Sequence, residues 1–269
     1  MAIQGKFVIG FHETFSLSRA SISQILENAS QTGALDRRFL ASTPLGTNYQ
    51  KAMPRYAYRA GLLDGKNHLT PFGRYAAKHD PALEKPGTQW LLHYHLAAPH
   101  GPTAFWHHLV TRRFLSGNVI RAEDLTEDLT DFLRRKAGKD PAPRSVRSTV
   151  TVFAGTYLKS DGLNRLGLLV EDEKNVYRVP FVDQPPLWAL GYALAEYWQA
   201  HYGERLTVNL DDLNGENFAG LFLLGESGFT DLLIQLKQEG VIDLYRIAYP
   251  YQVVLLQPSL EFALERLYA

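Results

Sequence analysis

The chain has 269 residues, of which 45% are hydrophobic, and its 28 Lys and Arg balance its 28 Asp and Glu. This length and apolar content suffice for one large domain or for two to three small ones. Cysteine is absent, which excludes disulfides, a thiolate nucleophile and cysteine-bound metal clusters. Because the sequence has neither an apolar run of membrane-spanning length nor a signal-peptide pattern, we expect a cytoplasmic protein without membrane contact.

Charge is distributed unevenly along the chain. The net charge is +5 over residues 1–80, +3 over residues 81–180 and −8 over residues 181–269. A basic front indicates nucleic acid as a ligand, and an acidic back indicates a protein partner. Docking of the two ends of the chain through opposite charge explains the same pattern nearly as well.

The first residues are predicted to form a strand followed by a helix. Apolar residues dominate residues 1–15, and Ser16 or Ser18 can cap a helix that runs to about Asn28. Four polar residues near this junction form a candidate phosphate-binding cluster: His12, Glu13, Thr14 and Arg19. We favour an ion pair and cap that fix the strand to the helix, because these residues alone cannot make a nucleophile, base and orienting group.

Residues 42–73 have the pattern of a winged helix. A turn leads into a helix that ends near Gly61, residues 64–67 make a tight turn, and a short strand and a new helix follow. Pro54 is expected to kink or restart the helix. The order is that of domains that place a helix in the major groove of DNA. The DNA-contact candidates here are Asn48, Lys51, Arg55, Arg59 and Lys66.

Thr88 can cap a buried helix, and residues 103–114 are predicted to continue it as a second helix. The segment from Trp90 to Leu96 is too apolar to face water. Five of the nine histidines lie between His93 and His108, but none has the i, i+4 spacing of a helical metal site. Core or interface histidines are therefore the better interpretation.

Residues 117–158 form a second candidate helix–turn–helix. An amphipathic acidic helix buries a face at Leu125, Leu129, Phe132 and Leu133. The next helix presents polar and basic residues in its first turns, which suits contacts to phosphates and base edges. These candidates are Arg144, Ser145, Arg147 and Ser148. A hairpin over residues 167–179 would be the wing of this unit.

Residues 184–269 are predicted to form an acidic α+β unit without a basic helix face, which is typical of an interaction module. Paired acids at residues 171–173 and 211–212 could bind magnesium in a nuclease. No lysine has nuclease-like spacing to them, and solvated turns explain them well.

Several separated strings carry a family resemblance. They are residues 11–15 with Arg19, Leu45-Gly46, Asn48, Lys51, Gly61-Leu62, residues 69–73, and above all Asp80-Pro81, Leu83-Glu84, 86–88 and 90–94. The combination resembles a bacterial family of unknown function, number 4007, often encoded beside phosphoadenosine-phosphosulfate-reductase-like sulfotransfer genes in DNA phosphorothioation and phage-defence islands. The resemblance implies a role in DNA binding or assembly within such a system, and it brings no known catalytic residues with it.

The sequence thus predicts a mostly α fold with small β hairpins (α+β). Its parts would be a winged-helix-like domain (1–80), connecting helices with a second winged-helix-like domain (81–183), and an acidic α+β interaction domain (184–269). We expect a non-enzymatic protein that binds duplex DNA, has neither cofactor nor metal, and has a sulfotransferase-like or ATPase partner. The alternatives are a scaffold that binds such a partner without DNA and, less favoured, a metal-dependent nuclease. A homodimer is compatible with the sequence.

Overall fold

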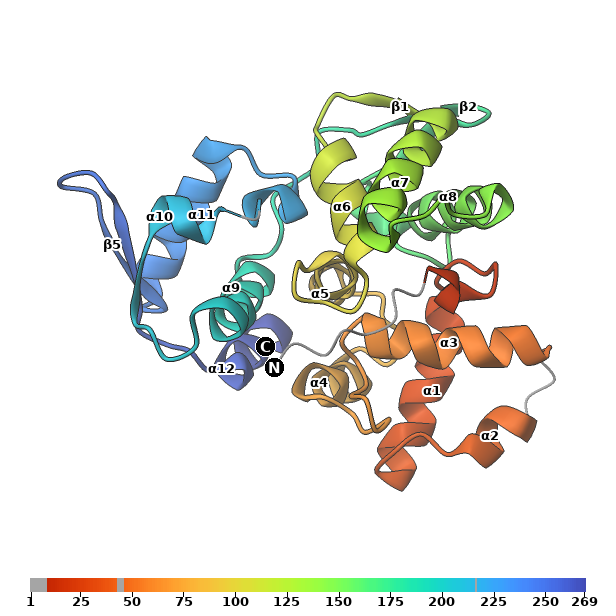
Figure 1. The fold of residues 1–269 in the computed structure, drawn as a ribbon. Helices are drawn as coiled ribbons and strands as arrows, with labels where there is room; N and C mark the ends of the chain where they lie inside the picture. The colour runs from red at the N-terminus through yellow and green to blue at the C-terminus, as the bar shows by residue number, and fades with distance from the viewer. Residues whose placement is uncertain (1–8, 43–45, 216) are drawn as a thin grey trace.

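The computed structural model of the chain describes residues 9–42, 46–215 and 217–269, and within these ranges it contains twelve α-helices and six short strands (Figure 1). In chain order the elements are η1 (Gly10–His12), α1 (Arg19–Thr32), α2 (Arg37–Ser42), α3 (Thr47–Arg59), α4 (Pro71–His79), α5 (Pro86–Ala97), α6 (Ala104–Arg113), β1 (Val119–Arg121), α7 (Ala122–Ala137), α8 (Pro143–Leu158), η2 (Asn164–Leu166), β2 (Val170–Glu173), β3 (Val176–Arg178), α9 (Leu187–Tyr202), β4 (Thr207–Asn209), α10 (Leu210–Leu213), η3 (Ala219–Phe222), α11 (Glu226–Gln238), β5 (Ile242–Tyr245), β6 (Gln252–Leu255) and α12 (Leu260–Tyr268). The predicted combination of helices with small β hairpins is confirmed. None of the described helices has the length and apolar character that a bilayer span requires.

The N-terminal segment differs from its prediction. Residues 1–8 lie outside the described residues, and Gly10–His12 form the 3-10 helix η1 where we expected a strand. The helix that follows is confirmed: the Ser18 hydroxyl accepts a hydrogen bond from the backbone N–H of Ser21, which caps α1. This helix is one turn longer than predicted and ends at Thr32.

The first region (residues 9–80) places α3 beside a minimal hairpin. The predicted turn at 43–45 lies outside the described residues. Helix α3 runs continuously across Pro54, so the expected restart is not observed. The chain then reverses at Gly61, whose φ of +77° is a conformation that glycine adopts without strain. Antiparallel bridges join Leu63 to Leu69 and Ala34 to His68, in place of longer strands.

Helix α5 lies at the centre of the molecule (Figure 1). All but one of its residues after Pro86 are buried, as the apolar sequence predicts, and it packs against α6 and α9. Gly87 permits close approach by the last helix, because an added Cβ would lie 2.6 Å from a Leu267 methyl. Beside it, the Thr88 and Tyr268 hydroxyls are hydrogen-bonded at 2.8 Å, and the Tyr268 ring stacks on His79 of α4.

The second region (residues 81–183) contains the amphipathic pair that the sequence predicts. Leu125, Leu129, Phe132 and Leu133 of α7 are buried, and α7 packs along α8. Strands β1, β2 and β3 form an antiparallel sheet in the order β1-β3-β2, with Ile120 opposite Tyr177. The order along the chain is therefore helix, strand, helix, helix and hairpin.

The third region (residues 184–269) repeats that order, which sequence reasoning did not predict. Helix α9 is followed by β4, α10, α11 and the hairpin β5–β6, and the antiparallel sheet has the equivalent order β4-β6-β5. In Figure 1 the β5–β6 hairpin extends away from the rest of the molecule. Helix α12 then packs against α9 and reaches α4 of the first region. The buried apolar side chains form one continuous cluster from Phe11 to Tyr268; the proposed domain boundaries stay a prediction.

Candidate nucleic-acid interface

The first turns of α8 carry the second set of predicted DNA contacts. Arg144, Ser145 and Arg147 are exposed, and Ser148 is partly buried. Within the described ranges, neither arginine forms an ion pair. Pro143 occupies the first turn, where its missing N–H costs nothing, and the turn contains no acidic residue. The positive end of the helix dipole and two free guanidinium groups therefore face solvent together.

The inward face of α8 explains why its polar face is held outward. Val146, Val150, Phe153 and Tyr157 are buried as predicted. The Phe153 ring packs against Trp106 of α6 at a centroid distance of 5.0 Å. This packing fixes the rotation of the helix about its own axis.

A groove of about 490 Å³ runs between α7, α8 and the turn of the β2–β3 hairpin. Arg147 and Thr151 line it from α8, Glu123 and Glu127 from α7, and Asn175 from the hairpin turn. Sequence reasoning missed these two carboxylates as site residues. Their i, i+4 spacing, which places them on one exposed side of α7, is the sequence pattern that could have identified them. A ligand in this groove would meet hydrogen-bond acceptors, the two carboxylates, and also one cation, the Arg147 guanidinium.

The first set of predicted contacts, on α3, is divided by the structure. Asn48 and Lys51 are exposed near the start of the helix, and Lys66 is exposed in the 64–67 turn, where its backbone N–H donates to Asp64. Arg55 and Arg59, near the end of the helix, turn toward the N-terminal segment instead. The predicted row of five contacts is therefore not one open surface.

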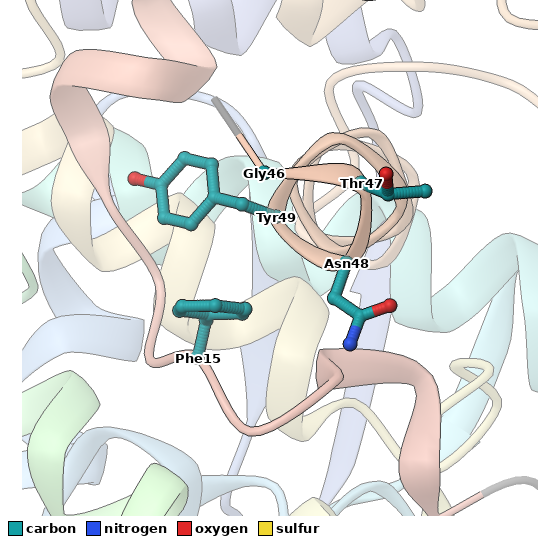
Figure 2. A pocket seen from close by; sticks show the side chains of 5 residues that line it. All are labelled: Phe15, Gly46, Thr47, Asn48 and Tyr49. Carbon is teal, nitrogen blue, oxygen red and sulfur yellow. The ribbon is translucent and has the colours of Figure 1, made fainter. Parts of the chain in front are cut away.

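A shallow pocket of about 400 Å³ lies at the start of α3 and is shown in Figure 2. The Phe15 and Tyr49 rings meet edge to face at 4.9 Å, and the Tyr49 hydroxyl is hydrogen-bonded to Ser21 at 2.7 Å, so this aromatic wall is fixed. The Asn48 carboxamide points to the same side of the helix as the Phe15 ring, whereas Thr47 points away. Asn48 thus presents a hydrogen-bond donor and an acceptor beside an apolar wall. Sequence reasoning named Asn48 as a site residue but missed Phe15 and Tyr49, which form that wall.

Arg55 contacts η1 and the residue after it, and Arg59 contacts η1. Arg55 Nη1 lies 2.7 Å from a Glu13 carboxylate oxygen and 3.3 Å from the Phe11 carbonyl oxygen. The Arg59 guanidinium lies over the Phe11 ring, 4.2 Å from its centroid, and burial lowers the pKa of Arg59. Arg59 is therefore mainly a packing residue in this structure.

His12 joins the N-terminal segment to α8. Its Nδ1 accepts a hydrogen bond from the Thr14 N–H at 3.0 Å, so Nε2 carries the proton and donates to the Thr149 hydroxyl at 3.1 Å. That hydroxyl in turn donates to the Ser145 carbonyl oxygen. Burial lowers the pKa of His12 from 6.5 to about 4, so the ring is neutral at neutral pH.

Arg19 does not join His12, Glu13 and Thr14 in one site. It is buried, and its guanidinium donates to the carbonyl oxygens of Gly162 and Ser160, each at 2.7 Å. These contacts clamp the start of α1 to the loop after α8. The polar residues near the N-terminus thus have separate structural partners.

The central histidines are packed in the core and at contacts between regions. His93 Nε2–H donates to the Leu221 carbonyl oxygen at 2.7 Å, and Nδ1 accepts from the Tyr157 hydroxyl, which accepts from Trp106. Burial lowers the pKa of His93 to about 4. This chain of hydrogen bonds links α6, α8, α5 and the third region.

Glu196 of α9 is a further buried charge. It accepts hydrogen bonds from the Tyr94 hydroxyl at 2.6 Å and from His100 at 2.7 Å. Burial alone would raise the pKa of Glu196, but the hydrogen bond from His100 and the proximity of His95 outweigh it and bring the pKa to about 2. Sequence reasoning missed this pairing, because His100 and Glu196 lie 96 residues apart in the chain.

The paired acids have local partners. The Asp172 carboxylate accepts hydrogen bonds from Nε and Nη2 of Arg178, at 2.8 and 2.9 Å, and this interaction lowers the pKa of Asp172. Asp211 accepts from the Tyr249 hydroxyl and Asp212 from the Asn209 amide. Over the described part of the chain, no group of three or more His, Asp or Glu side chains is arranged to hold a metal ion.

Comparison with known proteins identifies the family. The chain belongs to the family described as Protein of unknown function (DUF4007), which matches residues 10–267. Two solved structures have a similar fold. A magnesium-ion-bound crystal structure of SspB is 17% identical, with a TM-score of 0.74 over 96% of this chain and 87% of that chain. A second SspB crystal structure is 19% identical, with a TM-score of 0.73 over 95% and 85%. No protein with a curated function matches the chain.

Proposed function

We propose that this protein binds duplex DNA through the exposed first turns of α8, with a second contact at the start of α3. The observation that carries the proposal is the pair Arg144 and Arg147. Both are exposed at the positive end of a 16-residue helix, beside a hairpin, and neither is neutralised by an ion pair within the described residues. An anionic backbone is the ligand that such an arrangement suits.

The order of elements supports this proposal. Helix, strand, helix, helix and hairpin, with the last strand in the middle of the sheet, is the order of a winged helix, in which α8 would be the recognition helix. The first region follows the same order through α1, α2 and α3, with bridges at Ala34 and Leu63 in place of strands. If the first region is also a winged helix, α3 is the helix equivalent to α8.

The two helices would make different kinds of contact. Arg144 and Lys51 would bind phosphates, because each is an exposed cation on a helix that carries no acidic side chain. Arg147 lies in the groove with Glu127, and an arginine next to a carboxylate suits the edge of a G·C pair, where guanine accepts and cytosine donates. Asn48 would contact a base edge or sugar beside Phe15.

The proposal for a biological setting rests on the family resemblance of the sequence strings described above. We propose a non-enzymatic, DNA-binding component of a phosphorothioation-linked modification or phage-defence system. A matched pair of plain and phosphorothioated duplexes tests this setting. Preferential binding to the modified duplex would make the protein a reader of the modification, whereas equal binding would leave it a general DNA-binding component.

Fluorescence anisotropy with a short labelled duplex, at low and at physiological salt, tests DNA binding itself. The double variant Arg144→Gln/Arg147→Gln should weaken binding and reduce the slope of log affinity against log salt by about 0.9 for each lost phosphate contact. Arg205→Gln/Arg246→Gln is the matched control, because it removes two exposed arginines from the acidic third region. Equal loss in the control, or unchanged binding in the double variant, would contradict the assignment.

A protein-binding scaffold is the second candidate, and the third region favours it. At the tip of the β5–β6 hairpin, Ile247 is 96% exposed and Tyr249 is 74% exposed. Exposed apolar side chains on an ordered hairpin are typical of contacts to another protein. Co-purification of a sulfotransferase-like or ATPase partner that survives nuclease treatment, and that Ile247→Asp/Tyr249→Asp abolishes, would support this role over DNA binding.

A further inference from the structure

Residues 10–15 lie between the two helices that carry the proposed DNA contacts. In Figure 1 the segment with η1 is placed between α3 and α8, and η1 packs against both helices. Its Glu13 pairs with α3 and its His12 with α8. The segment therefore lies beside both helices and contacts Arg55 of α3 directly.

The contact between Glu13 and Arg55 has the chemistry of a phosphate contact. A carboxylate oxygen lies 2.7 Å from Nη1, with the Glu13 side chain 28% exposed and the Arg55 side chain 43% exposed. Carboxylate and phosphate oxygens use the same guanidinium N–H groups, at the same distance and with the same charge preference. Because both groups remain accessible to solvent, one anion can replace the other without opening the core.

The backbone at this contact is strained. Glu13 has φ +47° and Thr14 has φ +76°, two consecutive non-glycine residues in the left-handed region. This region is unfavourable for a β-branched residue such as Thr14. Hydrogen bonds to His12 hold the turn: its Nδ1 accepts from the Thr14 N–H and its carbonyl oxygen from the Phe15 N–H. Strain of this kind persists where the surroundings impose it, and it concentrates at sites that rearrange on binding.

We propose that Glu13 is an internal competitor for DNA phosphate at Arg55, so that Arg55 becomes a DNA contact only when a phosphate displaces the carboxylate. This inference rests on the proposed DNA-binding function and deepens it. Glu13 would set the specificity of the α3 site. A weakly charged or single anion does not outcompete a tethered carboxylate, whereas a duplex already held by α8 and Lys51 supplies phosphates at high local concentration.

The size of the effect follows from the exposure of the pair. Ion pairs of comparable exposure change equilibria by roughly two- to fivefold. Removing the Glu13 charge should therefore raise DNA affinity by about that factor. The freed Arg55 should also add one phosphate contact, which steepens the salt slope by about 0.9. A purely structural role for Glu13 predicts the opposite direction, because loss of the pair would loosen the segment.

The test is anisotropy with a plain duplex across a salt series, for wild type, Glu13→Gln and Glu13→Asn. Asparagine tolerates the left-handed conformation, so the second variant keeps the turn if glutamine disturbs it. Glu239→Gln is the matched control, since Glu239 pairs with Arg266 at 3.3 Å in the third region. We expect tighter binding and a steeper slope for both Glu13 variants, no change for the control, and no gain when Glu13→Gln is combined with Arg55→Gln.

The outcomes separate this inference from the proposed function. Binding that depends on Arg144 and Arg147 but is unchanged or weakened by both Glu13 variants would overturn the competitor role and leave DNA binding in place. A gain that persists in the Arg55→Gln background would also overturn it, because the effect would then be general electrostatics. Absence of binding by wild type and by both Glu13 variants would remove the DNA function and this inference with it.

Discussion

The second and third regions have the same order of elements and opposite surfaces. Helices α8 and α11 occupy equivalent places before a hairpin, and each buries an apolar face. The exposed turns of α8 carry Arg144 and Arg147, whereas α11 carries Glu226 and Asp231. The α8 hairpin closes in a short turn, and the α11 hairpin has an exposed apolar tip. A repeated scaffold thus fixes where a ligand would bind, and the exposed side chains decide which ligand that is.

The largest expected effect concerns what the two helices share. Phe153→Ala on α8 should lower the free energy of unfolding by about 3–5 kcal/mol, because the ring is fully buried among Trp106, Phe114 and Tyr157. Phe229→Ala on α11 should cost less, about 3 kcal/mol, since among the described residues its ring contacts one other aromatic ring, that of Phe218, at a centroid distance of 5.9 Å. Urea unfolding measures both. A larger loss for Phe229→Ala would show that the third region has the better-packed core.

The next effect concerns what the two helices do not share. Charge reversal in α8, Arg144→Glu/Arg147→Glu, should weaken DNA binding by roughly 100-fold at physiological salt, because the proposed phosphate contact of Arg144 becomes repulsive and the proposed base contact of Arg147 is lost. Reversal in α11, Glu226→Lys/Asp231→Lys, should change it by less than about threefold. Anisotropy titrations with one duplex compare the pairs directly. Equal and opposite effects would mean that net charge, and not the α8 surface, governs binding.

A pH effect tests the hydrogen-bond chain that joins the two regions. Burial lowers the pKa of His93 from 6.5 to about 4, so the unfolded chain takes up this proton first as the pH falls. The stability from neutral His93 is complete above pH 6.5 and is lost as the pH falls toward 4, which amounts to about 2 kcal/mol at pH 5. In His93→Asn the loss between pH 8 and pH 5 should shrink by about that amount in urea unfolding. An unchanged pH dependence would contradict the assigned neutral form.

The smallest expected effect lies at the tip of the third hairpin. Ile247→Asp should change the free energy of unfolding by less than about 0.5 kcal/mol, because the side chain is 96% exposed. It should also leave DNA affinity unchanged. Thermal unfolding and anisotropy measure the two quantities. A clear loss of stability would show that the tip is part of the fold, which would weaken its role as a partner contact.

Local pattern predicted the elements whose partners are close in sequence. The apolar spacing of α7, the reversal at Gly61 and the cap at Ser18 each depend on residues within a few positions, and each is confirmed. The buried character of α5 followed from composition alone.

Long-range contacts decided what the sequence could not show. Arg55 belongs to a regular exposed row on α3, but its partner Glu13 lies 42 residues earlier and turns it toward η1. Strand β4 has three residues and gains its identity by pairing with β6, more than 40 residues later, so the repeat in the third region has no local signal. The predicted DNA contacts themselves stay predictions, because exposure is a condition for binding and not a measure of it.

The contact between Tyr268 and Thr88 has a consequence for synthesis of the chain. Tyr268 of α12 supplies both the hydroxyl that bonds Thr88 and the ring that stacks on His79. It leaves the ribosome some 180 residues after these two partners. Early regions of many proteins fold while later ones are still being made. Here the parts of α4 and α5 that contact α12 stay uncovered until residues 260–268 emerge, so we expect a nascent chain stalled before that point to expose them.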